Sequence, residues 1–250
     1  MSHARIEQAL RRADGRPAIV AYLTAGYPDR ERFMSELDAL DHVADAVEIG
    51  VPFTDPMADG ATIQRAGRIA LAEGATLDRT LADLEAVVPR LPRVLMSYLN
   101  PFLALPHGSL PQRLLRAGID GVVVPDLPHE EALALREALD ASGIALVPMV
   151  TPLTSDARLE AIVRSARGFV YAVTSVGTTG RSVATGDALS QYLARVRRAA
   201  SVPVIAGFGV RIREHVAALC PPADGVVVGS AMVDAIDRGE SPARLVESLR

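Results

Sequence analysis

The stretch EIGVPFTDPMADG, residues 48–60, runs from an apolar strand into a loop that carries carboxylates. Glu48 interrupts a β-rich apolar run, and Asp55 and Asp59 follow on a loop stiffened by two prolines. A helical pattern over Thr62–Glu73 comes next. On a purely structural interpretation Asp59 is the N-cap of that helix, whereas a lone glutamate in a buried strand is costly without a partner or a function. The stretch therefore predicts a strand, a loop and a helix, with an acid and a base facing one pocket.

Short apolar, β-branched runs alternate with longer amphipathic runs along the whole chain, as expected of successive strand-helix units. The predicted strands are Ala18–Leu23, Ala46–Ile49, Val94–Tyr98, Gly121–Val124, Ala145–Met149, Gly168–Val173, Val202–Ala206 and Gly225–Val228. The predicted helices include Arg30–His42, Glu130–Ala141, Asp156–Ser165, Asp187–Ala200, Arg211–Leu219 and Ser241–Leu249. Eight such units in 250 residues predict an α/β fold, a (β/α)8 TIM barrel in a single domain spanning residues 1–250. An open doubly wound sheet is the alternative.

The composition excludes several classes of protein. A net charge of −4 without any long basic run argues against a nucleic-acid partner. No apolar run reaches the roughly 20 residues that span a bilayer, and the N-terminus lacks the apolar core of a signal peptide, so we expect a cytoplasmic protein. Cys220 is the only cysteine, which excludes an intrachain disulfide. All 26 basic residues are arginine, so this chain cannot form a lysine Schiff base or hold pyridoxal phosphate as an aldimine.

In a barrel of this kind the chemistry lies where the strands end. The last two predicted strands end in Gly207-Phe-Gly209 and Gly229-Ser230-Ala231, where small residues let backbone amides approach an anion. The second of these runs into a helical segment, whose N-terminus attracts phosphate. The sequence therefore predicts a phosphate site at these two strand ends. No cluster of histidines and carboxylates indicates a metal site.

The segment EIGVPFTDPMADGATIQRA closely resembles the tryptophan synthase alpha subunit family. The segments AYLTAGYPD, LMSYLNP, VVVPDLP, IAGFGV and GVVVGSA resemble the same family in its order and spacing, so that the resemblance covers essentially the full barrel. It implies retro-aldol cleavage of indole-3-glycerol phosphate to indole and D-glyceraldehyde 3-phosphate in tryptophan biosynthesis. Neither a metal nor an organic cofactor is needed for that reaction.

The resemblance also implies roles for individual residues. Glu48 is the acid-base residue that acts at indole C3 and at the glycerol hydroxyl, and Asp59 pairs with the indole N–H. The residues implied to hold the phosphate are Gly180, Gly209, Gly229 and Ser230. Those implied to line the indole slot are Tyr22, Tyr98, Val123, Phe208 and Val227, with Tyr171 beside Glu48. Thr179 matches a threonine on a loop that closes over the site, although residues 175–182 depart from the family's usual run there.

A partner follows from the same resemblance. Asp55, Pro56 and Asn100 would face a pyridoxal-phosphate-dependent beta subunit, which receives the indole within an alpha2-beta2 heterotetramer. On the residues alone, Asn100 could instead cap the turn before Pro101. The short segment before the first strand would reduce the helix that commonly plugs the bottom of the family's barrel.

The required chemistry explains the two acids. Breaking the bond from C3 to the glycerol needs a proton on C3, which Glu48 can deliver. A carboxylate at Asp59 stabilises the iminium-like nitrogen that results. We expect Glu48, in an apolar strand, to favour its protonated form, and Asp59, on a loop, to stay ionised. The alternatives are another phosphosugar barrel enzyme, against which the missing lysine argues, and a barrel that acts mainly as a regulatory partner.

Overall fold

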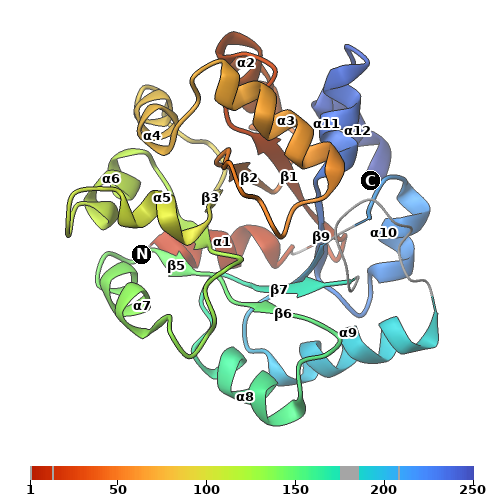
Figure 1. The fold of residues 1–250 in the computed structure, drawn as a ribbon. Coiled ribbons are helices and arrows are strands. Elements are labelled where there is room, and N and C mark those ends of the chain that lie inside the picture. Colours follow the sequence, from red (N-terminus) through yellow and green to blue (C-terminus); the bar gives the residue numbers. More distant parts are fainter. Residues whose placement is uncertain (1, 13, 175–185, 208) are drawn as a thin grey trace.

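The computed structural model describes residues 2–12, 14–174, 186–207 and 209–250, and a parallel sheet curls around its centre (Figure 1). The strands are β1 (Ala18–Thr24), β2 (Ala46–Gly50), β3 (Arg93–Met96), β4 (Gly121–Val123), β5 (Ala145–Leu146), β6 (Met149–Val150), β7 (Val170–Val173), β8 (Val204–Gly207) and β9 (Gly225–Val228). They are ordered β5-β4-β3-β2-β1-β9-β8-β7-β6, and neighbours pair in parallel. Because β5 and β6 follow each other in the chain, they share one position of an eight-position ring. The predicted TIM barrel is confirmed, and the open sheet is wrong.

The predicted strand Ala145–Met149 is not continuous, which corrects the sequence-based expectation. β5 pairs with β4 through Ala145 and Leu146, and β6 pairs with β7 through Met149 and Val150. Between the two segments lies Pro148, which has no backbone N–H to give to a ladder. The carbonyl of Pro148 still accepts the N–H of Tyr171, at 2.9 Å. The fifth strand position is therefore split at this proline.

The helices surround the strands as an outer ring, except for α1, which crosses the middle of the view (Figure 1). They are α1 (Ser2–Leu10), α2 (Arg30–Leu40), α3 (Ala61–Ala72), α4 (Leu77–Glu85), α5 (Leu99–Leu103), α6 (Leu110–Arg116), α7 (Leu133–Asp140), α8 (Asp156–Arg164), α9 (Asp187–Ala199), α10 (Arg213–Leu219), α11 (Ser230–Asp237) and α12 (Pro242–Leu249). Of the helices that the sequence predicted, all but α7 begin within two residues of the prediction. α7 begins three residues late, because Glu131 and Ala132 donate to carbonyls three residues earlier and form turns instead. No helix in the described ranges is long and apolar enough to span a membrane.

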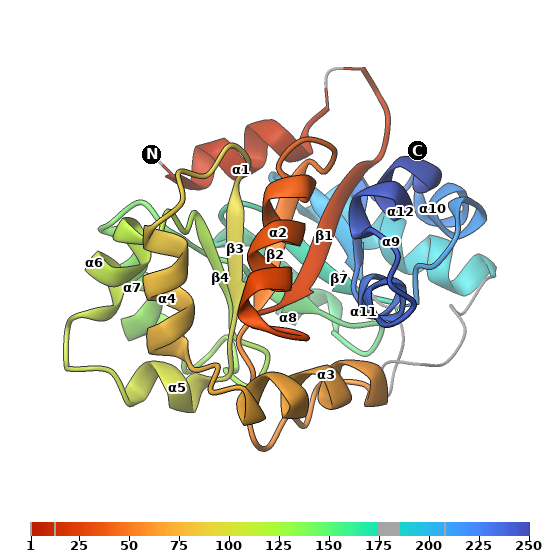
Figure 2. The same ribbon diagram turned by 90° about the horizontal axis from the view of Figure 1, so that it is seen from above.

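The two ends of the barrel differ. Helix α1 lies across one end, while α3 and α5 lie at the other (Figure 2). Ile6 and Leu10 of α1 are fully buried, and a Cβ added to Gly121 at the start of β4 would lie 2.8 Å from Cδ1 of Ile6. The N-terminal segment thus forms a nine-residue helix that packs against the N-terminal ends of the strands. The C-terminal ends, where barrel chemistry is found, lie toward α3 and α5.

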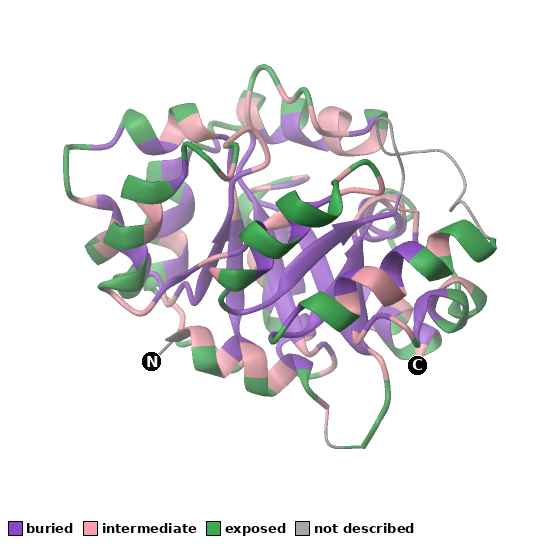
Figure 3. Cartoon of the chain, turned by 90° about the horizontal axis from the view of Figure 1, so that it is seen from below, coloured by how far each residue is buried: buried purple, intermediate pink, exposed green. Residues whose placement is uncertain are grey.

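The strands are buried along nearly their whole length, as Figure 3 shows. Among the described residues, two charged side chains on the strands themselves are buried. Arg93, at the N-terminal end of β3, donates to the carbonyls of Val87 at 3.2 Å and Leu84 at 3.3 Å, near the end of α4. Glu48 lies on β2, toward the other end of the barrel. The hydrogen-bonding groups of Arg93 are thus satisfied in part by carbonyls at the end of α4, whereas Glu48 lies where the active site is expected.

Candidate active site

Glu48 points into the barrel from β2. Its register partners are Tyr22 on β1 and Val94 on β3, so that two neighbouring strands shield it from solvent. The residue is 1% exposed, and its Oε2 has no hydrogen-bond partner among the described residues. Burial, together with the nearby charge of Asp59, raises the pKa of Glu48 to about 8. Glu48 is therefore mostly protonated at neutral pH and can act as an acid.

Asp59 lies on the loop between β2 and α3, and it is not the helix cap. The N-cap of α3 is Gly60, which has no side chain to cap with. The Asp59 carboxylate instead takes a hydrogen bond from Tyr98, and its backbone carbonyl accepts Nε2 of Gln64 at 2.9 Å. Burial raises the pKa of Asp59 to about 6, against the lowering effect of the Tyr98 hydrogen bond. The N-cap interpretation of Asp59 is thus wrong, and the residue is mostly ionised at neutral pH.

Two tyrosines form the walls beside Glu48, and each needs a glycine across from it. A Cβ added to Gly50 would lie 2.1 Å from Oη of Tyr22, and one added to Gly207 would lie 2.2 Å from Cε1 of Tyr171. Both approaches are closer than any real Cβ contact, so these strand ends admit only glycine without movement of the rings. Burial raises the pKa of both phenols, which keeps them neutral.

The N-terminus of α11 faces the same space. Its N-cap is Gly229, which provides no side-chain cap, so that first-turn N–H groups and the Ser230 hydroxyl are available to an anion. Gly209, after β8, has a φ of +82°, a left-handed conformation that favours glycine. Gly209, Gly229 and Ser230 all line one cavity with the two acids. An anion can therefore be held beside Glu48 and Asp59.

We call this space the central cavity; its volume is about 50 Å³. It is lined by Tyr22, Glu48, Asp59, Ile63, Met96, Tyr171, Gly209, Val227, Gly229 and Ser230. Sequence reasoning missed Ile63 and Met96. Ile63 lies in the first turn of α3, and Met96 is the last residue of β3.

Some predicted site residues lie elsewhere. Tyr98 does not line the central cavity. The Tyr98 hydroxyl instead accepts the Ala58 N–H at 2.9 Å and so holds the loop between β2 and α3. Val123 is fully buried at the end of β4 and is not among the lining residues. Thr179, Gly180 and Phe208 lie outside the described residues.

Comparison with known proteins decides the family. The family model described as "Tryptophan synthase alpha chain" matches residues 8–249. The chain belongs to the tryptophan synthase alpha chain family. The resemblance found in the motifs is confirmed.

Relatives of the tryptophan synthase alpha chain family match over nearly the full length. The chain is 42% identical to the tryptophan synthase alpha chain of Phenylobacterium zucineum over 242 residues, which are 94% of this chain and 87% of the relative. A structure of Mycobacterium tuberculosis tryptophan synthase superposes with a TM-score of 0.90 at 36% identity, covering 98% of this chain and 96% of that one. A structure of the tryptophan synthase α2β2 complex from Pyrococcus furiosus gives a TM-score of 0.84 at 37% identity, covering 93% and 97%.

The residues that the tryptophan synthase alpha resemblance assigned to a partner lie at the C-terminal end of the barrel. Asp55 is exposed and accepts the Thr54 hydroxyl at 2.6 Å. The Phe53 ring stacks on Tyr98, with centroids 5.0 Å apart, so that the loop after β2 touches the segment that leads into α5. Two apolar side chains stand out from these segments, Met57 at 74% and Leu103 at 69% exposure. Together with Pro56 and the exposed Asn100, these residues form a rim at the C-terminal end of the barrel.

Proposed function

We propose that this chain cleaves indole-3-glycerol phosphate to indole and D-glyceraldehyde 3-phosphate, the lyase reaction of tryptophan synthase alpha chains. One observation carries the assignment: two carboxyl groups with pKa values of about 8 and about 6 share a cavity with a helix N-terminus. Near pH 7 such a pair supplies one proton donor and one carboxylate, as this cleavage requires. The helix N-terminus supplies a place for the substrate's phosphate.

Glu48 is proposed to move the protons. Its carboxylic acid gives a proton to indole C3, which makes that carbon tetrahedral and the ring nitrogen iminium-like. The Glu48 carboxylate then accepts the proton of the glycerol hydroxyl as the bond from C3 to the glycerol breaks. The electrons of that bond return to the ring, so that indole and the aldehyde leave and Glu48 is protonated again.

Asp59 is proposed to stabilise the charge that develops on nitrogen. Its carboxylate accepts the indole N–H hydrogen bond, which strengthens as the nitrogen becomes cationic. The hydrogen bond from Tyr98 and the Gln64 contact to the Asp59 backbone hold this carboxylate in place. The neutral Tyr171 is proposed to stay beside Glu48.

Substrate binding is proposed to divide between the two ends of the cavity. The phosphate would bind the amides of Gly209 and Gly229 and the Ser230 hydroxyl, all of which line it. The indole would lie between Tyr22, Val227 and the two apolar side chains that sequence reasoning missed, Ile63 and Met96. Roles for Val123, Thr179, Gly180 and Phe208 remain proposals from the family resemblance.

We further propose a single catalytic domain spanning residues 1–250, acting in the cytoplasm with a pyridoxal-phosphate-dependent beta subunit in an alpha2-beta2 heterotetramer. The family match over residues 8–249 and the one continuous hydrophobic core support the single domain. The Pyrococcus furiosus relative, solved as an α2β2 complex, supports the partner. The exposed Met57 and Leu103, beside Asp55, Pro56 and Asn100, would be covered by it.

The test is indole release from indole-3-glycerol phosphate by Glu48→Gln and Asp59→Asn variants. Removing a positioned proton-transfer or charge-stabilising group is expected to lower the rate by roughly 10²-fold or more. Glycerol 3-phosphate should bind both variants as it binds the wild type, because the phosphate end is unchanged.

Glu36→Gln is a matched control, since Glu36 is also a buried glutamate, 5% exposed, but lies on α2. It should release indole at nearly the wild-type rate. A Glu48→Gln variant that kept more than half of the wild-type rate would show that the assignment is wrong.

A further inference from the structure

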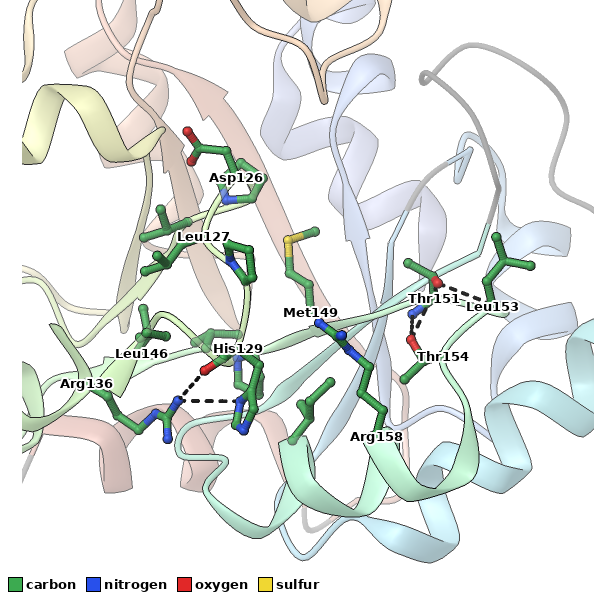
Figure 4. A pocket seen from close by; sticks show the side chains of 17 residues that line it. Asp126, Leu127, His129, Arg136, Leu146, Met149, Thr151, Leu153, Thr154 and Arg158 are labelled. Atoms are coloured by element: carbon green, nitrogen blue, oxygen red, sulfur yellow. Dashed lines mark hydrogen bonds between the residues drawn. The ribbon is translucent and has the colours of Figure 1, made fainter. Parts of the chain in front are cut away.

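A second cavity opens in the side of the barrel near the C-terminal strand ends, and we call it the lateral cavity. Its volume is about 530 Å³, roughly ten times that of the central cavity and within the range of small-molecule sites. It lies between the loop 124–128 after β4 and the segment that carries β6 and the start of α8 (Figure 4). Arg136 and Arg158 line it from the sides of α7 and α8.

The split fifth strand explains why the wall opens there. The ladder between β4 and β5 has only two residue pairs, the last being Val122 with Leu146. Val147 still donates to Val122, at 2.8 Å, but Pro148 has no N–H with which to continue. The delayed start of α7, at Leu133, leaves residues 124–132 without a helix to fill the gap. The cavity therefore results from the path of the backbone, and not from the small size of one side chain.

The floor of the lateral cavity is apolar. Leu146, Met149 and Ile162 line it, and Ile162 is 3% exposed. In Figure 4, Arg158 extends from α8 toward Met149, so that a guanidinium lies above this floor. Such a surface favours a ligand with an apolar body and a charged end.

The charge around the cavity favours one negative charge. Arg158 already pairs with Glu130 at 2.9 Å, so that its charge is matched. Arg136 donates to the His129 carbonyl at 3.2 Å and lies 3.5 Å from Nδ1 of that ring, but it forms no ion pair with a carboxylate within the described residues. Asp126 also lines the cavity, but it accepts the Leu99 N–H at 2.9 Å and lies at the end away from Arg136 (Figure 4). One guanidinium charge thus remains unmatched at the α7 end.

His129 lies near both arginines of the lateral cavity, and its pKa responds to their charges. Burial lowers the pKa of His129, and the charges of Arg136 and Arg158 lower it further, against the opposing effect of Glu130. The ring is therefore neutral near pH 7 and adds a hydrogen-bonding group without adding charge.

We propose that the lateral cavity binds a small organic carboxylate. The carboxylate would take paired hydrogen bonds from the planar fork of Arg136, which matches its geometry, with Arg158 beside it. The apolar part would cover Leu146, Met149 and Ile162. A monoanion fits better than a phosphate dianion, because only one guanidinium charge is unmatched. This site shares no lining residue with the central cavity and does not depend on the function proposed there.

The experiment is a calorimetric titration of the full chain, which measures its affinity for 3-phenylpropionate and for the neutral 3-phenylpropan-1-ol. The acid is expected to bind at least tenfold more tightly than the alcohol, because hydrogen bonds to charged groups contribute that much. Arg136→Met and Arg158→Met should each weaken the acid about tenfold or more. Arg158 is 48% exposed as a side chain, so its replacement should not affect folding.

Two further variants locate the binding. Arg164→Met removes an exposed arginine of the same helix that does not line the cavity, and it should leave the affinity unchanged. Ser230→Glu places a second negative charge in the central cavity and should also leave it unchanged. The proposal would be overturned if the wild type did not bind the acid, or if it bound acid and alcohol equally. It would also be overturned if Arg136→Met and Arg158→Met both kept full affinity, or if Ser230→Glu lost affinity.

Discussion

Glu48 and Asp59 share one cavity, yet their surroundings separate their pKa values. Glu48 is fixed on a strand between apolar neighbours, and one of its oxygens has no hydrogen-bond partner among the described residues, so burial raises its pKa to about 8. Asp59 is also partly buried, but the hydroxyl of Tyr98 stabilises its ionised form and its pKa reaches only about 6. Two carboxyl groups of one molecule can therefore hold different protonation states at the same pH.

A pH profile of kcat/KM for indole formation should be bell-shaped. The reaction as proposed needs ionised Asp59 and protonated Glu48, so activity should rise as pH increases through about 6 and fall as it increases through about 8. Tyr98→Phe removes the hydrogen bond that lowers the Asp59 pKa, and it should shift the rising limb to higher pH while leaving the falling limb in place. A wild-type profile that stays flat through pH 8 would contradict the role of Glu48.

At the scale of elements, α3 and α11 begin beside the two halves of the proposed site. α3 begins just after Asp59, and α11 begins at the proposed phosphate position. The helices are joined through Asp237, the last residue of α11, which receives hydrogen bonds from Arg65 of α3 and from the Tyr27 hydroxyl. An acid is unfavourable at a helix C-terminus, so helix stability alone does not account for Asp237. The cluster links the two helices that begin beside the proposed site.

We expect Arg65 and Asp237 to be energetically coupled. In a double-mutant cycle with Arg65→Met and Asp237→Asn, urea unfolding should give a coupling of roughly 1 kcal/mol, at the upper end for partly exposed pairs. The nearby Arg238 and Glu240 form a matched control pair, since both side chains are 56% exposed and 2.7 Å apart. That pair should couple clearly more weakly, because solvent screens both of its groups. Equal coupling in the two pairs would mean that the cluster does not join the helices.

The sequence predicted the strands and the acid-bearing loop because buried parallel strands are nearly continuous apolar runs. It did not reveal the split at Pro148, since the run Ala145–Met149 is apolar throughout and the effect of a proline depends on which neighbours need its N–H. The sequence also did not decide whether Asp59 or Gly60 is the N-cap of α3, because the two candidates differ by a single position at the start of the helix. Ile63 and Met96 were missed because an apolar side chain that faces a cavity has the same pattern as one that faces the core.

At the scale of the whole molecule, the proposed active site lies at the end of the barrel that carries the exposed Met57 and Leu103. The rim is made by the loop after β2, with Asp55 and Met57, and by α5, with Asn100 and Leu103. These two segments contact each other where Phe53 stacks on Tyr98. Since Tyr98 also holds Asp59, a partner bound to the rim would touch the same loop that carries a catalytic residue of the proposed reaction.

A beta subunit should therefore stimulate indole formation through the Asp55 loop. Asp55 lies four residues from Asp59 and is exposed, so that docking can restrict the loop to the conformation in which Asp59 is correctly placed, a shift of population rather than a new contact with substrate. Asp55→Ala should lose most of the stimulation by beta while keeping basal indole formation nearly unchanged. Asp38→Ala, which removes an exposed acid on the side of α2, should be stimulated like the wild type. Binding coupling is reciprocal, so glycerol 3-phosphate should tighten the complex of beta with the wild type more than that with Asp55→Ala. Equal stimulation of the wild type and Asp55→Ala would show that this loop does not transmit the effect, and a wild type that beta does not stimulate would indicate a lyase that works alone.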